Sequence, residues 1–113
     1  MKPSSAKAKG RKLQQWVRDH LLSLAEHLEP DDIRSTSMGA GGEDVQLSPA
    51  ARRLFPVSIE CKNLARFAGY TLYDQAVANC PRGAEPLVVV KANNRNPLVL
   101  VDAVYYFERY TNE

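Results

Sequence analysis

The fold is decided by one stretch of the chain, Pro56-Val57-Ser58-Ile59-Glu60-Cys61-Lys62-Asn63. Apolar and polar side chains alternate along it, with the apolar ones at positions 57, 59 and 61. This alternation predicts a strand that turns one set of side chains to a core and the other set to a second surface. Glu60 and Lys62 would then stand side by side on that second surface. Most such pairs in proteins are plain ion pairs, so the interpretation depends on what precedes this stretch.

A second alternating stretch lies upstream, at Asp44-Val45-Gln46-Leu47-Ser48. It predicts a short strand whose polar face begins with Asp44. If the two strands are antiparallel neighbours, Asp44 and Glu60 share a face, and a fold keeps two carboxylates together only with a partner cation. A hard divalent ion with oxygen ligands, Mg²⁺ above all, suits that place. The predicted chemistry is phosphodiester cleavage: Asp44 and Glu60 hold the metal, and Lys62 orients the attacking water or offsets developing charge.

These residues resemble the active-site motif of the PD-(D/E)xK nuclease superfamily. Within it, the chain is similar to small phage-encoded endonucleases described as Holliday-junction-resolvase-like. The similarity runs from Ile33 to Asn63 and continues through Asp74-Gln75-Ala76 and Leu87-Val88-Val89-Val90-Lys91. It implies a Mg²⁺-dependent endonuclease, with Mn²⁺ as a substitute, that cuts branched DNA such as a four-way junction and works as a homodimer.

Other interpretations of the function stay open at this point, among them an interaction module that binds no nucleic acid and would show no salt-dependent affinity for DNA. Another is a nuclease of the same fold that nicks duplex, flap or single-stranded DNA. A third is a DNA-binding protein without catalytic activity.

The resemblance also implies roles for residues outside the central pair. The Cys61 carbonyl is expected to be a further metal ligand, and Gln75, on the helix after Glu60-Cys61-Lys62, to position the water or the scissile phosphate. Gln14 stands where related resolvases carry an acidic residue, and we expect it to assist at the site. For both glutamines an ordinary place on a helix surface is the alternative.

Contacts with the DNA backbone are expected from basic and hydroxyl side chains in several places. The candidates are Lys9, Arg11, Lys12, Arg34, Ser35, Thr36, Arg52, Arg53 and Lys91. For each of them the alternative is a solvated polar residue. The net charge is only +2, but six basic residues precede the first acid, Asp19, which favours binding to phosphates at that end.

Length and composition predict one domain of ordinary globular type. The chain has 113 residues, and we expect a basic flexible arm at residues 1–9 and a single nuclease domain at 10–113. No apolar run is long enough to cross a bilayer, no secretory signal begins the sequence, and Cys61 and Cys80 lack the spacing of metal ligands. These features predict a cytoplasmic protein without a membrane partner, in the host cytoplasm if it is phage-encoded.

The predicted elements alternate between helix and strand. Helices are expected at residues 10–28, at 49–54, from 66 or 69 to 79, and after Asp102 through Tyr110. Strands are expected within 31–38, 44–48, 56–62, 87–92 and 98–101, with a hairpin turn at Asn93–Asn96. The fold class predicted is α/β, a restriction-endonuclease-like mixed β-sheet flanked by helices in the order α-β-β-β-α-β-β-α.

Overall fold

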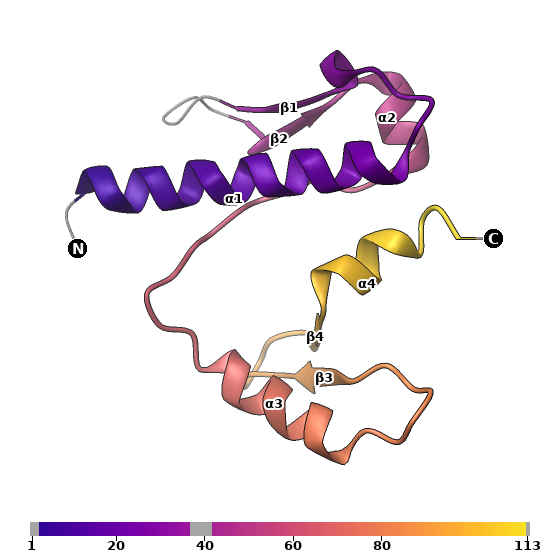
Figure 1. The fold of residues 1–113 in the computed structure, drawn as a ribbon. Helices are drawn as coiled ribbons and strands as arrows, with labels where there is room; N and C mark the ends of the chain where they lie inside the picture. Colours follow the sequence, from indigo (N-terminus) through magenta and orange to yellow (C-terminus); the bar gives the residue numbers. More distant parts are fainter. Residues whose placement is uncertain (1–2, 37–41, 113) are drawn as a thin grey trace. The chain divides into compact units, whose positions relative to one another are not determined.

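The computed structural model describes residues 3–36 and 42–112, which divide between two compact units. The N-terminal unit comprises Met1–Asn63 and Phe107–Glu113, and the hairpin unit comprises Leu64–Tyr106 (Figure 1). Each unit has its own secondary structure and is described separately. The predicted end of the first strand at Met38, the residues after it through Gly41 and the first two residues of the predicted arm lie outside the described residues.

Helix α1, Pro3–Leu24, is the long element of the N-terminal unit. Gln14, Val17 and Leu21 are buried at spacings of three and four residues, which is the period of one helix face. The helix begins at Pro3 instead of Gly10, so it includes residues that we expected to form a flexible arm. It ends at Leu24 instead of Leu28, and buried Ala25 and Leu28 lie in the turns that follow.

Strands β1, Ile33–Ser35, and β2, Val45–Leu47, form an antiparallel pair over the helix (Figure 1). Ile33 is opposite Leu47 and Ser35 is opposite Val45. A short 3-10 helix, η1 at Pro30–Asp32, leads into β1. Ile33 and Val45 are completely buried, so this small sheet lays its apolar face on α1.

Helix α2, Pro49–Leu54, has the bounds that the sequence predicted. Ser48 is its N-cap and accepts a hydrogen bond of 3.1 Å from the Ala51 N–H, with Pro49 at the first helical position. Phe55, directly after the helix, is completely buried and meets Tyr110 edge-on at a ring distance of 6.2 Å. Phe55 belongs to the core of this unit together with Val17 and Leu21 of α1.

The central stretch is extended but forms no regular strand. Burial alternates along it as predicted, because Val57, Ile59 and Cys61 pack on the core while Glu60 and Lys62 are exposed. Its ladder pairing among the described residues is a single antiparallel bridge between Val45 and Ile59.

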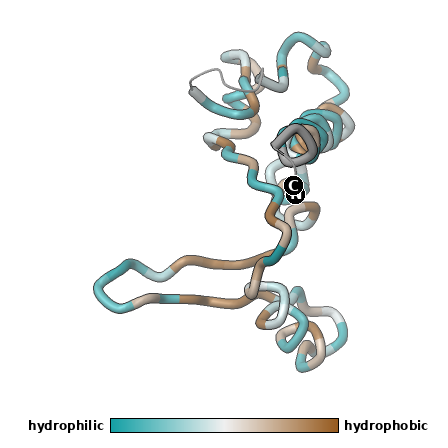
Figure 2. The backbone as a smooth tube through the Cα atoms, turned by 90° about the vertical axis from the view of Figure 1, so that its left-hand side faces the viewer, coloured by the Kyte–Doolittle hydropathy of each residue, from teal (hydrophilic) through white to brown (hydrophobic). Residues whose placement is uncertain are grey.

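The hairpin unit contains helix α3, Gly69–Asn79, and the antiparallel strands β3, Leu87–Val90, and β4, Leu98–Val101. Both strands are apolar, and the turn between them is hydrophilic (Figure 2). Asn94 lies in that turn with a φ of 62°, a conformation that asparagine adopts more readily than most residues. The predicted strand at 87–92 is present but ends at Val90, and its apolar residues Leu87 and Val89 are 50% and 63% exposed.

The last helix, α4, is Ala103–Glu108 and is shorter than the predicted segment through Tyr110. Asp102 caps it as predicted, since Asp102 Oδ1 accepts a hydrogen bond of 3.1 Å from the Tyr105 N–H.

The prediction of a single mixed sheet is not confirmed. The described residues contain four α-helices and two separate two-stranded antiparallel sheets, so the chain is mixed α/β in a coarser sense than expected. The physical reason is at the central stretch, where the Cys61 N–H donates to the Asp44 side chain instead of to a neighbouring strand. A side chain that takes a ladder donor in this way competes with sheet pairing. Nowhere in the described part of the chain is a helix long and apolar enough to cross a membrane.

Candidate active site

Asp44 lies directly beside the central stretch. Its backbone N–H donates to the Ile59 carbonyl at 3.1 Å, and its Oδ2 accepts a hydrogen bond of 2.7 Å from the Cys61 N–H. On the other side, the Asp44 carbonyl accepts a 2.9 Å hydrogen bond from the Thr36 N–H. The half-buried Asp44 is therefore held by backbone groups of both flanking segments, and it contacts the central stretch through Ile59 and Cys61. The convergence of the Asp44 and Glu60 carboxylates on one cation stays a prediction.

Glu60 and Lys62 point to the exposed side of the stretch. Lys62 Nζ lies 3.7 Å from Glu60 Oε1, and the two side chains are 72% and 64% exposed. This is the ion pair that the residue spacing alone suggests. A pair so open to water contributes little to stability, which leaves both groups available to a charged ligand.

The charge of both acids is felt at Cys61. Burial raises the pKa of the Cys61 thiol, and the negative charges of Asp44 and Glu60 raise it further. Asp44, directly before β2, and Glu60, in the central stretch, thus act on the same thiol. The thiol is accordingly a neutral, half-buried group of the core near neutral pH, as the apolar position of Cys61 suggested.

Gln14 is buried against β1. Only 4% of the residue is exposed, and its Oε1 accepts a hydrogen bond of 2.9 Å from Ser35 Oγ. Its place on the inner face of α1 agrees with the predicted helix phase. The alternative of an ordinary surface glutamine is therefore wrong, while a role in assisting chemistry stays a prediction.

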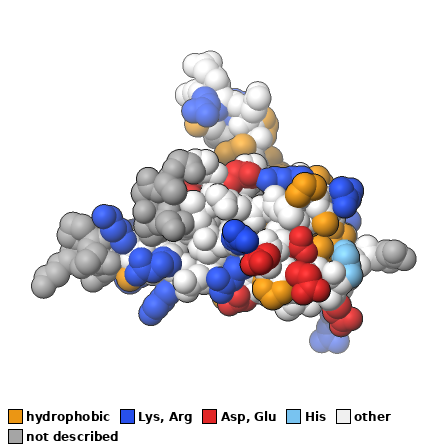
Figure 3. All heavy atoms as spheres, turned by 90° about the horizontal axis from the view of Figure 1, so that it is seen from above, with side chains coloured by type: hydrophobic (Ala, Val, Ile, Leu, Met, Phe, Trp, Pro, Cys, Tyr) orange, Lys and Arg blue, Asp and Glu red, His pale blue; other side chains and the backbone are white. Residues whose placement is uncertain are grey.

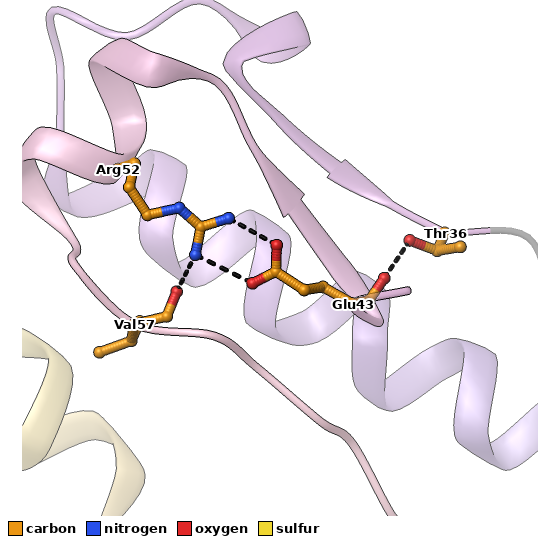
Figure 4. Close-up of polar contacts among 4 residues, drawn as sticks. All are labelled: Thr36, Glu43, Arg52 and Val57. Carbon is orange, nitrogen blue, oxygen red and sulfur yellow. Dashed lines mark hydrogen bonds and ion pairs between the residues drawn. The ribbon is translucent and has the colours of Figure 1, made fainter. Parts of the chain in front are cut away.

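A second acid beside Asp44 was not identified from the sequence. Glu43 receives two hydrogen bonds from Arg52, at 2.9 Å and 2.6 Å, and Arg52 also donates to the Val57 carbonyl (Figure 4). The Glu43 carbonyl accepts a 2.6 Å bond from Thr36 Oγ1. The Arg52 guanidinium and then the Ser58 hydroxyl hold the pKa of Glu43 below its ordinary value, and Glu43 raises the pKa of Arg52. The only available signal was opposite charge, because no spacing rule links residues 43 and 52.

The predicted DNA contacts fall into two groups by environment. Lys9, Arg11, Lys12, Arg34, Arg53 and Lys91 are exposed, although Arg34 lies 3.5 Å from Asp31 and Lys91 Nζ donates to the Ala92 carbonyl at 3.3 Å. Ser35, Thr36 and Arg52 are at least partly buried and bond within the N-terminal unit. Figure 3 shows Lys and Arg side chains without acidic ones toward the left of the viewed face, and both basic and acidic side chains toward the right.

Gln75 and Lys91 belong to the hairpin unit. Gln75 is an exposed residue of α3, and Lys91 follows the last residue of β3. Their relation to Asp44 and Glu60 stays a prediction.

The donor set suits a hard cation. Across residues 3–36 and 42–112, no three acidic, histidine or cysteine side chains gather as a ready-made metal site. Mg²⁺ does not require one, because it keeps several waters and takes one or two protein carboxylates together with substrate phosphates. One oxygen of the Asp44 carboxylate accepts the hydrogen bond from the Cys61 N–H. The other carboxylate oxygen has room for further ligands. Asp44, Glu60 and the Cys61 carbonyl are oxygen donors of the required kind.

Comparison of the chain with protein-family models, with curated proteins and with solved structures finds no match.

Proposed function

We propose that this protein is a metal-dependent DNA endonuclease, and specifically a structure-selective resolvase that hydrolyses phosphodiester bonds in four-way junctions. The observation that supports this most directly is the hydrogen bond from the Cys61 N–H to Asp44 Oδ2, together with the bridge between Val45 and Ile59. These contacts hold Asp44 beside the segment Glu60-Cys61-Lys62. Such a combination is the minimal residue set for phosphodiester hydrolysis with a divalent ion.

In this proposal each residue has a defined task. Asp44 and Glu60 hold Mg²⁺, or Mn²⁺ in its place, with the Cys61 carbonyl as a further ligand, and the bound ion supplies charge stabilisation and a more acidic water. Lys62, exposed and 3.7 Å from Glu60, would orient the attacking water with its ammonium or offset charge on the phosphate. Gln75 and Gln14 assist, and action as a homodimer on two strands of a junction belongs to the same proposal.

The proposal is tested by cleavage of labelled DNA by the purified protein. We expect Mg²⁺-dependent cutting of a four-way junction, loss of cutting on addition of a chelator, and recovery with Mn²⁺. Glu60→Gln and Asp44→Asn should each reduce the rate at least about a hundredfold, because each removes a charged ligand of the cation. Lys62→Gln should reduce the rate while leaving metal affinity nearly unchanged.

Substrate choice is decided by comparing the junction with linear duplex, flap and single-stranded DNA of matched length. Equal cutting of all of them would remove the resolvase part of the proposal and leave a general endonuclease. Binding of DNA without cutting by the wild-type protein in Mg²⁺ and in Mn²⁺ would instead show a non-catalytic DNA-binding protein. Unchanged cutting by Glu60→Gln would contradict the site.

A further inference from the structure

The Glu43–Arg52 contact joins three separate segments of the N-terminal unit. Arg52 is on α2, Glu43 precedes β2, and the Val57 carbonyl belongs to the central stretch. The carboxylate and guanidinium meet through two parallel bonds, the geometry with the highest directional specificity among ion pairs. The side chains of Arg52 and Glu43 are only 37% and 31% exposed, so solvent competes less here than at the open pair of Glu60 and Lys62.

The ends of this contact lie next to the two halves of the candidate active site. Glu43 is the residue directly before Asp44, and Val57 is three residues before Glu60. Thr36 fixes the same position from β1, with its hydroxyl on the Glu43 carbonyl and its N–H on the Asp44 carbonyl. The contact with Arg52 therefore restrains the backbone directly before Asp44, in addition to the hydrogen bonds that Asp44 makes with Ile59 and Cys61.

We propose that Glu43 and Arg52 form a positioning pair that holds Asp44 against Ile59–Cys61. This inference rests on the proposed function for its catalytic meaning, but its structural content can be measured separately. It gives Arg52 an internal task in place of the contact with a DNA phosphate that the sequence suggested. A single bridge connects the central stretch to β2, so the side-chain pair supplies the register that a regular ladder would otherwise provide.

Lysine at position 52 separates positioning from phosphate binding. Arg52 donates two hydrogen bonds to Glu43 and one to Val57, and the planar shape of the guanidinium fixes their directions. The ammonium of lysine, on a flexible side chain, cannot reproduce this arrangement. A phosphate contact needs mainly the positive charge, which Arg52→Lys keeps. Glu43→Gln provides the second distinction, because it weakens the pair and leaves Arg52 free to bind a phosphate.

The experiment is amide hydrogen exchange, read by NMR, in wild type, Arg52→Gln, Arg52→Lys and Glu43→Gln. The reporters are the Asp44 N–H and the Cys61 N–H, which make the contacts at the site. We expect exchange at both to be about tenfold faster in all three variants, since local opening is what the pair opposes. The Phe55 N–H, bonded within the α2 turn, reports whether that helix is still folded. Arg82→Gln, an exposed arginine in the hairpin unit, is the matched charge control.

The outcomes are distinct for each part of the inference. Unchanged exchange of Asp44 and Cys61 in Glu43→Gln and Arg52→Gln overturns the positioning pair, whether or not the protein cuts DNA. If α2 unfolds in the Arg52 variants, Glu43→Gln decides, because that residue lies outside the helix. Fast exchange in Arg52→Gln and Glu43→Gln together with wild-type exchange in Arg52→Lys would show that charge alone suffices, which also overturns the geometric argument.

Cleavage kinetics add a measurement that would not change if Glu43 and Arg52 had a purely structural role. The positioning pair predicts a fall in kcat of about tenfold or more for Glu43→Gln with little change in KM for DNA, because Asp44 is displaced while the DNA contacts remain. Arg52→Gln and the double variant should match it, since both changes break one interaction. A raised KM confined to Arg52→Gln and restored by Arg52→Lys would assign Arg52 to the phosphate instead. Absence of cleavage by wild type would refute the proposed function and leave the exchange result standing.

Discussion

At the scale of single residues, Gln14 shows how one polar side chain is accommodated inside a small core. Its amide oxygen is paired with Ser35 Oγ at 2.9 Å, in a place where an unpaired polar atom would be costly. We expect Gln14→Ala to lower the free energy of unfolding by about 1–3 kcal/mol, because packing and hydrogen bonds are lost together. Urea unfolding followed by circular dichroism measures this. Gln46→Ala, at an exposed position of β2, is the control and should change stability by less than about 0.5 kcal/mol.

Asp32 connects one carboxylate to the pH dependence of stability. Its Oδ1 accepts a 2.7 Å bond from Ser48 Oγ and its Oδ2 a 2.8 Å bond from the Glu29 N–H, and these bonds, Ser48 first, lower the pKa of Asp32. A folded-state pKa below the unfolded one means that the stabilisation is complete above the unfolded pKa, near 4, and is lost as the pH falls through the folded pKa. We expect Asp32→Asn to be less stable than wild type at pH 7, with the difference shrinking steadily from pH 4 to pH 2.

Measurement of the urea midpoint of both proteins across that pH range tests the prediction. Ser48→Ala should reduce the same pH-dependent difference, because it removes the largest cause of the lowered pKa. A constant gap between wild type and Asp32→Asn at all pH values would contradict the assignment.

At the scale of elements, the N-terminal core depends on the residue that follows α2. Phe55 is completely buried, whereas Phe67, in the hairpin unit, is 47% exposed. Phe55→Ala should cost about 3–5 kcal/mol, since it removes a buried ring and leaves a cavity beside Tyr110. Phe67→Ala removes the same atoms from a half-open site and should cost clearly less. Equal losses of stability in thermal unfolding would mean that Phe55 is not a core residue of the folded protein.

Local signals in the sequence predicted the elements more accurately than their pairing. Ser48-Pro49 located α2 and Asp102 located the start of α4, because capping and proline geometry act within one turn. Alternation correctly predicted which residues of the central stretch face the core. It did not predict hydrogen-bond partners, which depend on another segment of the chain, and here the Asp44 carboxylate takes the Cys61 donor. The beginning of α1 was missed because apolar periodicity weakens before Leu13 while the residues remain compatible with a helix.

Contacts between distant segments were also hard to predict in the candidate active site. Asp44 and the Glu60-Cys61-Lys62 segment were predicted together, and the structure places them in contact. Glu43 was missed and Arg52 was assigned to DNA, because a pair nine residues apart across a helix and a strand follows no repeat. The single mixed sheet is not confirmed for a related reason: it required long-range pairing on which residue patterns within each strand carry little information.

At the scale of the whole molecule, each unit carries exposed basic side chains that the proposed function assigns to DNA. Lys9, Arg11 and Lys12 are exposed on α1, and Lys91 is exposed beside a surface concavity of about 630 Å³ in the hairpin unit, which Arg95 and Asn96 also line. The hairpin from Leu87 to Val101 contains the basic residues Lys91 and Arg95 and no acidic residue. A surface with that charge attracts phosphate groups, and the attraction weakens as salt is added.

The salt dependence of DNA affinity measures how many phosphates each of these basic residues neutralises. Every phosphate neutralised adds about 0.9 to the slope of log K against log salt on duplex DNA, so Lys91→Ala should reduce the magnitude of the slope by about 0.9 if it meets one phosphate. Replacement of Lys9, Arg11 and Lys12 together should reduce it by up to about 2.7 on the same basis. Fluorescence anisotropy with Ca²⁺ in place of Mg²⁺ allows the titration without cutting. Arg82→Ala is the matched control, and a slope equal to that control for Lys91→Ala would exclude Lys91 from the DNA interface.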